Sequence, residues 1–290
     1  NDPLVPAAAS GAAARQKSPA FLQGRAQMVK RFQESPILPR LLGERGYVSL
    51  QTGKWWMGDY STGGFTEGMT KGGRHGDVGL DIGRKSLAPL TDFITRSKQS
   101  GKPFFAWYAP MMPHDPHTPP ERLLAKYRDK SPTLQAARYH AMVEWFDETI
   151  GEVRAHLEKE GLTRDTVIVY IADNGWIQSP DSAGYAPRSK QTANEGGVRQ
   201  PIMFSWPGVI RPGARGEQLC SSIDIVPTLD MWNAMGRVGA MLGWHWPFMA
   251  QPADLPERMM GSVPADWFLR KKLLKLTADL NHIPPEIWAE

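Results

Sequence analysis

Polar residues that could act on an anionic group lie next to several strand-like segments. Lys54 follows "VSLQTG" and His114 follows "PFFAWYAPMM". Asp173 and Asn174 follow "VIVYIA", and Lys190 precedes the apolar run "PIMFSW". Lysine and histidine would neutralise charge that develops on a tetrahedral oxyanion, whereas carboxylate and amide oxygens suit a hard cation such as calcium or magnesium. If they converge, these residues indicate metal-assisted attack on a sulfate or phosphate ester.

Helical segments alternate with these strands. Residues 87–99 form an amphipathic pattern that stops at a glycine, and residues 136–161 repeat apolar side chains at intervals of three and four. The alternation predicts an α/β fold, with a mostly parallel sheet sandwiched by helices. In such sheets ligands bind beyond the carboxyl ends of the strands. We therefore expect the polar residues to gather at one edge of the sheet.

Composition narrows the class of protein and its partners. The 290 residues are 41% hydrophobic and 22% charged, with a net charge of +4 from 34 basic and 30 acidic residues. These charges form no long run of one sign, so we expect no nucleic-acid partner. No apolar segment approaches the ~18 residues that a membrane span needs. The single cysteine, Cys220, excludes an internal disulfide and a Cys-rich metal site.

Other segments carry weaker signals. Residues 1–27 predict an irregular lead-in without a signal-peptide pattern, as if the chain started partway through a longer protein. Residues 61–85 predict a surface loop, in which Arg74 and His75 are candidates for substrate selection. His117 is either structural or substrate-facing. We expect Arg199 to pair with an acid, and the acidic face of the long helix to be solvated; that face carries Glu144, Asp147 and Glu148.

Several motifs together resemble the successive blocks of a type I sulfatase. They are "GKWWMG", "PFFAWYAPMMPHDPHTPPERLL", the segment from "ARYHAMVEWF" to "VIVYIADNGW", "RSKQTANEGGVRQPIMFSWPG" and "SSIDIVPTL". The resemblance covers residues 1 to about 229. It implies the alkaline-phosphatase-like α/β fold and hydrolysis of sulfate esters on a sulfated small molecule or glycan. Relatives of this kind are often exported, but the compartment and the oligomeric state stay open.

The resemblance also assigns roles to the residues at the strand ends. Asp173 and Asn174 would be two calcium ligands, with magnesium as a possible substitute. Lys54 and Lys190 would hold sulfate oxygens, and His114 would contact the sulfate or assist the leaving group. By this likeness the strand ends on Asp-Asn because these side chains face a metal.

Two departures from the family pattern affect the expected activity. The Asp-Asp pair that completes the metal site, and the Cys/Ser-x-Pro-Ser-Arg motif whose first residue becomes formylglycine, are absent from these 290 residues and would lie upstream. Cys220 lacks the Pro-Ser-Arg context. Trp56 stands where the commoner pattern "GKWH" has histidine. We therefore expect this chain alone to hold calcium weakly and to be inactive.

The tail resembles a second family. From about residue 224 to the end it is similar to the helical cap of a haloacetate dehalogenase, an α/β-hydrolase, and His245 and Trp246 match the pair that receives the halide. The catalytic residues of that enzyme are missing, so we favour a helical segment with aromatic packing over a halide site. The domain organisation we expect is a lead-in, a sulfatase-like domain over 28–229 and a joined helical segment over 230–290, with a natural or artificial join near 224–232.

Two other functions remain compatible with the sequence. One is a phosphodiesterase or phosphonate hydrolase of the same superfamily, for which "PHxP" and "EGGxRxP" fit less well. The other is a non-catalytic pseudoenzyme that binds sulfated glycans. The first would differ in its nucleophile, and the second would bind sulfated sugars without turnover.

Overall fold

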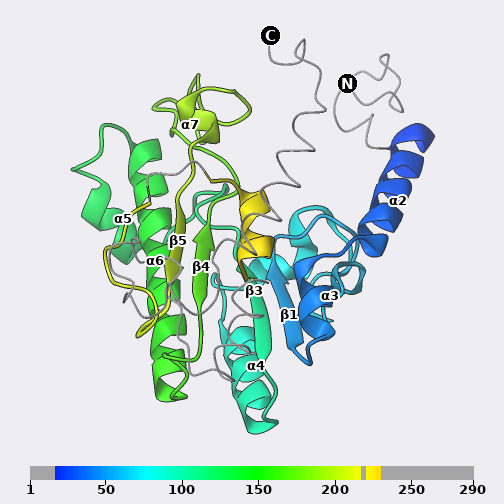
Figure 1. Cartoon of the computed structure of the whole chain (residues 1–290). Helices are drawn as coiled ribbons and strands as arrows, with labels where there is room; N and C mark the ends of the chain where they lie inside the picture. The colour runs from blue at the N-terminus through cyan, green and yellow to red at the C-terminus, as the bar shows by residue number, and fades with distance from the viewer. Residues whose placement is uncertain (1–16, 217–219, 230–290) are drawn as a thin grey trace.

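The computed structural model describes residues 17–216 and 220–229 (Figure 1). Strand β1 (Val48–Gly53) is central in a three-stranded parallel sheet, between β2 (Glu67–Gly68) and β3 (Phe104–Ala109). Strands β1 and β3 pair over their whole length, from Val48 opposite Phe104 to Gly53 opposite Ala109. Because the two strands are parallel and in register, the residues that follow them emerge at the same edge.

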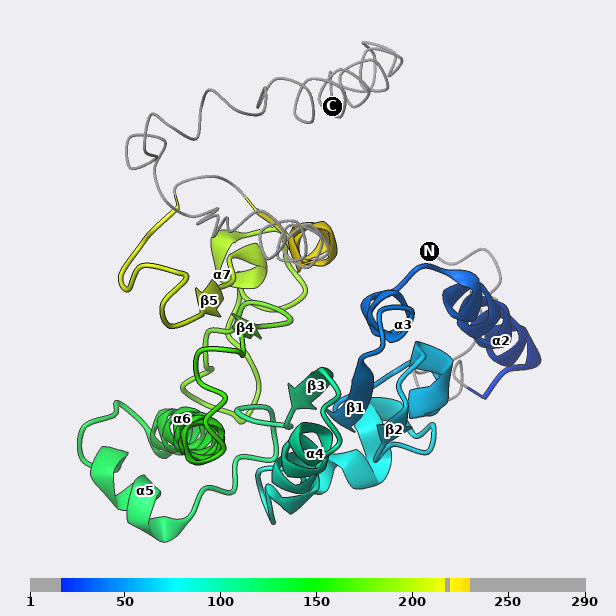
Figure 2. The same cartoon turned by 60° about the horizontal axis from the view of Figure 1, so that its bottom comes forward.

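A second sheet consists of β4 (Ile168–Ile171) and β5 (Ile202–Ser205). These two strands are antiparallel, with Ile171 opposite Ile202. The pair lies on the β3 side of the first sheet (Figure 1 and Figure 2). Every side chain of β4 is only half-buried, although its apolar sequence is typical of a strand covered on both faces. The predicted strands are therefore present, but β5 runs against the parallel direction.

The main core lies between the first sheet and α4 (Ala88–Gln99). Helix α4 buries Leu90, Phe93 and Ile94. Phe93 and Ile94 follow Leu90 by three and four residues, which places all three on a single face of the helix. They pack with Leu50 of β1 and Leu157 of α6 (Leu134–Lys159). Helix α3 (Leu38–Gly43) lies on the opposite side of the β1–β3 sheet (Figure 2). The sheet that carries Lys54 is thus held between two helical layers.

Helix α5 (Glu121–Tyr127) packs along α6 in a smaller core. Small residues of α6 allow this close approach, and the cluster consists of Leu123, Leu124, Ala137 and Ala141. Arg122 pairs with Glu148 at 2.6 Å and Lys126 with Glu144 at 2.5 Å. The acidic face of α6 therefore meets the cations of α5 at the protein surface.

Two expectations about irregular segments were wrong. Helix α2 (Pro19–Glu34) begins well before residue 28, because the Ser18 side chain accepts a hydrogen bond from the Phe21 N–H and caps it. Within 61–85, the short helices η1 (Tyr60–Gly63) and η2 (Arg74–Asp81) flank β2. Thr70 is buried there and donates to the buried Gln51 side chain at 2.9 Å. This region is therefore packed onto β1.

The remaining elements are short. They are α7 (Glu195–Val198), a single turn in front of β5, and η3 (Ser222–Asp224). Cys220 is an exposed free thiol. Among the helices that the structure describes, none combines the length and apolar character needed to cross a membrane. The dehalogenase-like segment, with His245 and Trp246, lies outside the described residues.

Candidate active site

Lys54 is placed by a close approach of the ends of β1 and β3. Gly53 adopts φ +74°, and a Cβ atom there would lie 1.9 Å from the Ala109 carbonyl oxygen. The Lys54 N–H donates to that same oxygen at 2.6 Å. Only glycine fits this position, because any side chain would collide with the β3 backbone. The turn directs Lys54 to the edge where the loop after β3 also begins.

The Lys54 side chain meets the end of β4. Its Nζ lies 2.5 Å from Oδ2 of Asp173, and the two side chains are 21% and 63% exposed. Asn174 donates from Nδ2 to the Gly175 carbonyl at 2.9 Å, which leaves its amide oxygen as an acceptor. The ends of β1 and β4 therefore converge, as the sequence predicted.

His114 lies in the loop after β3 and contacts the next residue. Its Nδ1 is 2.6 Å from Oδ1 of Asp115. The Arg84 guanidinium holds this loop by donating to the carbonyls of Met111 at 2.5 Å and His114 at 3.1 Å. Burial lowers the pKa of Arg84, while the Asp115 charge opposes that shift. The sequence gives no signal for Arg84, because its role depends on contacts about 30 residues away.

A series of ring contacts connects Lys54 with His114. Lys54 Nζ lies 5.4 Å from the centre of the Trp56 ring, within cation–π range. Trp56 meets His75 edge-on at 5.4 Å, and His75 lies 5.9 Å from His114. Trp56 thus packs over the lysine at the position where the commoner pattern has histidine. His75 is close to the site, as expected of a substrate-selecting residue, but its role stays a prediction.

Lys190 lies in the loop between β4 and α7. Its Nζ lies 5.5 Å from the Trp176 ring centre. The Ile177 N–H donates to the buried Ser189 hydroxyl at 2.6 Å. Gly175 packs against Gly196, because a Cβ atom on Gly175 would lie 2.1 Å from the Gly196 carbonyl oxygen. These contacts hold the start of the loop against its end, so Lys190 lies next to the residues that follow β4.

His114 and Lys190 open into one pocket of about 270 Å³. The other residues of its wall are Asp115, Trp176, Ala183, Gly184 and Tyr185. The Tyr185 hydroxyl donates to Gln191 at 2.7 Å. The wall therefore combines aromatic rings with a lysine and a histidine, which suits an anionic group attached to a ring. Sequence reasoning missed Trp176 and Tyr185, whose positions depend on the folding of two loops.

The described residues do not form a complete metal site. They contain no group of three or more His, Cys, Asp or Glu side chains arranged to bind a metal. Asp173 is paired with Lys54, and Asn174 offers one amide oxygen. Calcium takes six to eight oxygen ligands, so these two residues do not complete its coordination.

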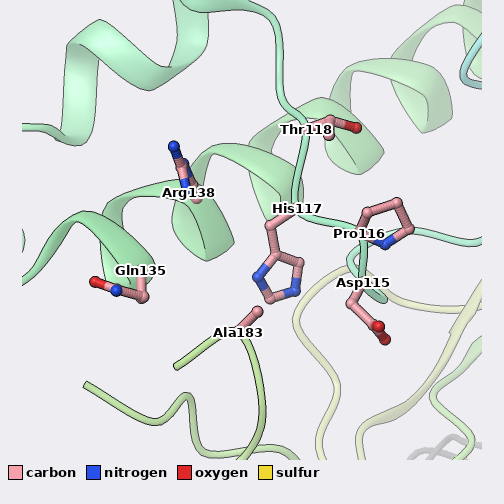
Figure 3. Close-up of a pocket in the computed structure, with 7 residues that line it drawn as sticks. All are labelled: Asp115, Pro116, His117, Thr118, Gln135, Arg138 and Ala183. Carbon is pink, nitrogen blue, oxygen red and sulfur yellow. The ribbon is translucent and has the colours of Figure 1, made fainter. Parts of the chain in front are cut away.

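Next to this pocket lies a second one, of about 260 Å³, which shares Asp115 and Ala183 with it. Its wall also includes His117, Gln135 and Arg138 (Figure 3). Burial lowers the pKa of His117, and the His114 and Arg84 charges add to that effect while Asp115 opposes it. His117 is therefore a neutral imidazole near pH 7.

Comparison with known proteins decides the family. The sulfatase family model matches residues 3–232. The chain belongs to the sulfatase family. A sulfatase of Formosa agariphila is 34% identical over 152 residues, or 48% of this chain and 28% of that protein. N-acetylgalactosamine-6-sulfatase of Canis lupus familiaris is 28% identical over 66% of this chain and 44% of its own length. Arylsulfatase A of Homo sapiens is 30% identical over 49% of this chain and 27% of its own length. This chain spans less than half the length of these relatives.

Solved structures support the sulfatase fold. Ps i-CgsB, crystallised in complex with k-i-k-neocarrahexaose, aligns with a TM-score of 0.58 at 21% identity, over 70% of this chain and 54% of its own. BT4656, in complex with its substrate D-glucosamine-2-N,6-O-disulfate, aligns with a TM-score of 0.54 at 17% identity, over 70% and 61%. The predicted alkaline-phosphatase-like α/β fold is therefore confirmed.

Proposed function

We propose that this chain is the sulfate-binding part of a sulfate-ester hydrolase and is inactive by itself, with Lys54, His114 and Lys190 around the sulfate group. The observation that carries the proposal is the shared pocket of His114 and Lys190, two residues from separate segments of the chain. Lys54 lies near His114, because its Nζ contacts the Trp56 ring, Trp56 contacts His75, and His75 contacts His114. Two ammonium groups would balance the charge that builds on the sulfate oxygens.

The geometry suggests a specific role for His114. Because Asp115 engages Nδ1, the ring's Nε2 is the nitrogen left to face a substrate. In its protonated form Nε2 could donate to the ester oxygen as the S–O bond breaks, so that the alcohol leaves neutral. Asp115 would stabilise that imidazolium and fix its orientation. We assign no residue of this chain as the nucleophile that would attack sulfur.

Calcium is part of the proposal, with Asp173 and Asn174 as two of its ligands. Bound there, the cation would polarise the sulfate group. Lys54 now occupies the Asp173 carboxylate, so the lysine and the cation would compete for it. Lys54 would then turn toward the sulfate.

The substrate class we propose is a sulfated sugar. Trp176 and Tyr185 present aromatic surface beside the cationic groups, and sugar rings stack on such faces. The relatives named N-acetylgalactosamine-6-sulfatase point to the same class. We further propose that the sulfatase unit extends to about residue 229 and that the remaining residues form the separate helical segment.

The test uses the 290-residue chain, with an aryl sulfate and the matching aryl phosphate as ligands. Binding and phenol release are measured with and without calcium, and Lys190→Ala is the background. We expect the sulfate to bind better than the phosphate, and the variant to lose that binding. Preference for the phosphate would favour a phosphoryl-transfer enzyme, and binding of neither ester would contradict the proposal.

Phenol release in the same samples tests a separate expectation. We expect none above the Lys190→Ala background, because the nucleophile motif is absent from these residues. Saturable binding with no release would also be the behaviour of a glycan-binding pseudoenzyme. Clear calcium-dependent release that Lys190→Ala abolishes would show that another residue activates water or acts as the nucleophile.

A further inference from the structure

The Arg84 guanidinium binds the loop after β3 at several points. It donates to the Met111 carbonyl at 2.5 Å and to the His114 carbonyl at 3.1 Å. It also donates to the Pro116 carbonyl at 3.4 Å and to the Thr118 hydroxyl at 3.3 Å. Five N–H donors in one rigid plane allow this set of contacts, which a lysine ammonium cannot reproduce. The loop is therefore held by one cation on both sides of His114.

The position of Arg84 is itself fixed by the surrounding structure. The preceding residue, Gly83, has φ +76°, and a Cβ atom there would lie 2.5 Å from the Tyr108 hydroxyl. Ile82, one residue earlier, is fully buried. The guanidinium carbon of Arg84 lies 5.9 Å from the centre of the Trp145 ring of α6. Both the backbone and the side chain of this arginine are thus held in place, so the carbonyls that it binds are held as well.

The loop depends on contacts of this kind because its own backbone has few donors. Pro113 and Pro116, on either side of His114, have no N–H to give to a hydrogen bond. The His114 ring contacts Asp115 of the same loop at 2.6 Å, so the ring moves with the loop. Where the loop is held therefore decides how the imidazole lies in the pocket that it shares with Lys190.

Arg84 is not part of the wall of that pocket. We infer that Arg84 is a positioning residue: it binds no substrate, and its contacts with the loop after β3 set the place and orientation of the His114 imidazole beside the sulfate group. The inference rests on the proposed function, because it needs His114 to contact the sulfate. It predicts that Arg84 affects sulfate binding only through His114. A residue that served stability alone would affect binding equally with or without that imidazole.

The test is a double-mutant cycle on the whole chain, with p-nitrophenyl sulfate as the titrated ligand. Arg84→Lys keeps the positive charge but cannot hold the same carbonyls together. We expect roughly tenfold weaker binding in His114→Ala, which loses one charge-assisted contact, and a similar loss in Arg84→Lys. The double variant should bind as His114→Ala does, because the two residues act as one unit.

A matched control is Lys85→Gln, which changes the next residue. Lys85 is an exposed lysine that pairs with Asp81 at 2.9 Å, and its replacement should leave the affinity unchanged. A second readout is the NMR signal of the His114 ring, identified as the histidine signal that His114→Ala removes. This signal should shift in Arg84→Lys, whereas the ring signal of His156 on α6 should not.

Three results would contradict the inference and leave the proposed function standing. Arg84→Lys might bind the sulfate as wild type does, or weaken the His114→Ala variant further, or leave the His114 signal in place. An Arg84→Lys chain that does not fold, as judged by urea unfolding, would also contradict it, since Arg84 would then serve stability. If neither His114→Ala nor Lys190→Ala weakens binding, the proposed function itself is wrong.

Discussion

The Nζ of Lys54 lies 2.5 Å from Oδ2 of Asp173, and this contact joins the ends of two strands that are 119 residues apart. Because the Asp173 side chain is 63% exposed, the pair adds at most about 1 kcal/mol to stability. Lys54→Ala should therefore change the free energy of unfolding by no more than about 1 kcal/mol. The same variant should bind an aryl sulfate at least tenfold more weakly. Urea unfolding and titration of the same samples separate the two effects. Loss of folding in the variant would show a structural role instead.

Calcium should stabilise the wild-type chain if Asp173 and Asn174 are ligands. A ligand that binds only the folded state raises the unfolding temperature, by an amount that grows with its concentration. We expect a small rise in millimolar calcium, because the described residues supply only two ligands. Asp173→Asn should abolish the rise, and Asp181→Asn, which changes an exposed acid further along the same loop, should keep it. An equal response of all three proteins would indicate non-specific binding of the cation.

Gly53→Ala should be strongly destabilising. The new Cβ would meet the Ala109 carbonyl oxygen at 1.9 Å, so the ends of β1 and β3 would have to separate. Gly101→Ala is the control, since Gly101 also has a positive φ, +64°, but no atom within 4 Å. The control should lose about 1–2 kcal/mol from backbone strain alone. Similar losses in the two variants, measured by urea unfolding, would mean that the strand ends adapt to a side chain.

The unfolding free energy should depend on His117 below neutral pH. Burial lowers the pKa of His117 below its usual 6.5, so the unfolded chain binds the proton more readily than the folded one. Stability from this residue is present above pH 6.5 and falls as the pH drops toward the folded pKa. His117→Phe should therefore lose less stability than wild type between pH 7.5 and 5.5. Equal losses in urea unfolding would show that His117 does not carry this dependence.

The sequence predicted most of the regular elements, because their signals are local. The apolar spacing of α4 and α6 and the apolar runs of β3 and β4 can each be recognised within a short stretch of sequence. The orientation of β5 could not be predicted in this way, since it depends on the path of the intervening loop. The burial of residues 61–85 likewise follows from the tertiary contact between Gln51 and Thr70.

The candidate site was predictable to the extent that it lies at strand ends. Lys54 and Asp173 meet as expected, and His114 and Lys190 share a pocket. Arg84 and Arg138 gave no signal, because an isolated arginine in a sequence is by default a surface residue. Their environment arises only when a loop and a helix distant in sequence come together. The roles of all these residues in binding and catalysis remain predictions.

The central claim is that Lys54 and Lys190, from separate segments, hold the same sulfate group. A double-mutant cycle tests it most directly: titration of 6-sulfated N-acetylgalactosamine into wild type, Lys54→Ala, Lys190→Ala and the double variant. We predict at least tenfold weaker binding in each single variant, no detectable binding in the double variant, and no change for unsulfated N-acetylgalactosamine. Wild-type affinity of the double variant for the sulfated sugar would contradict the account.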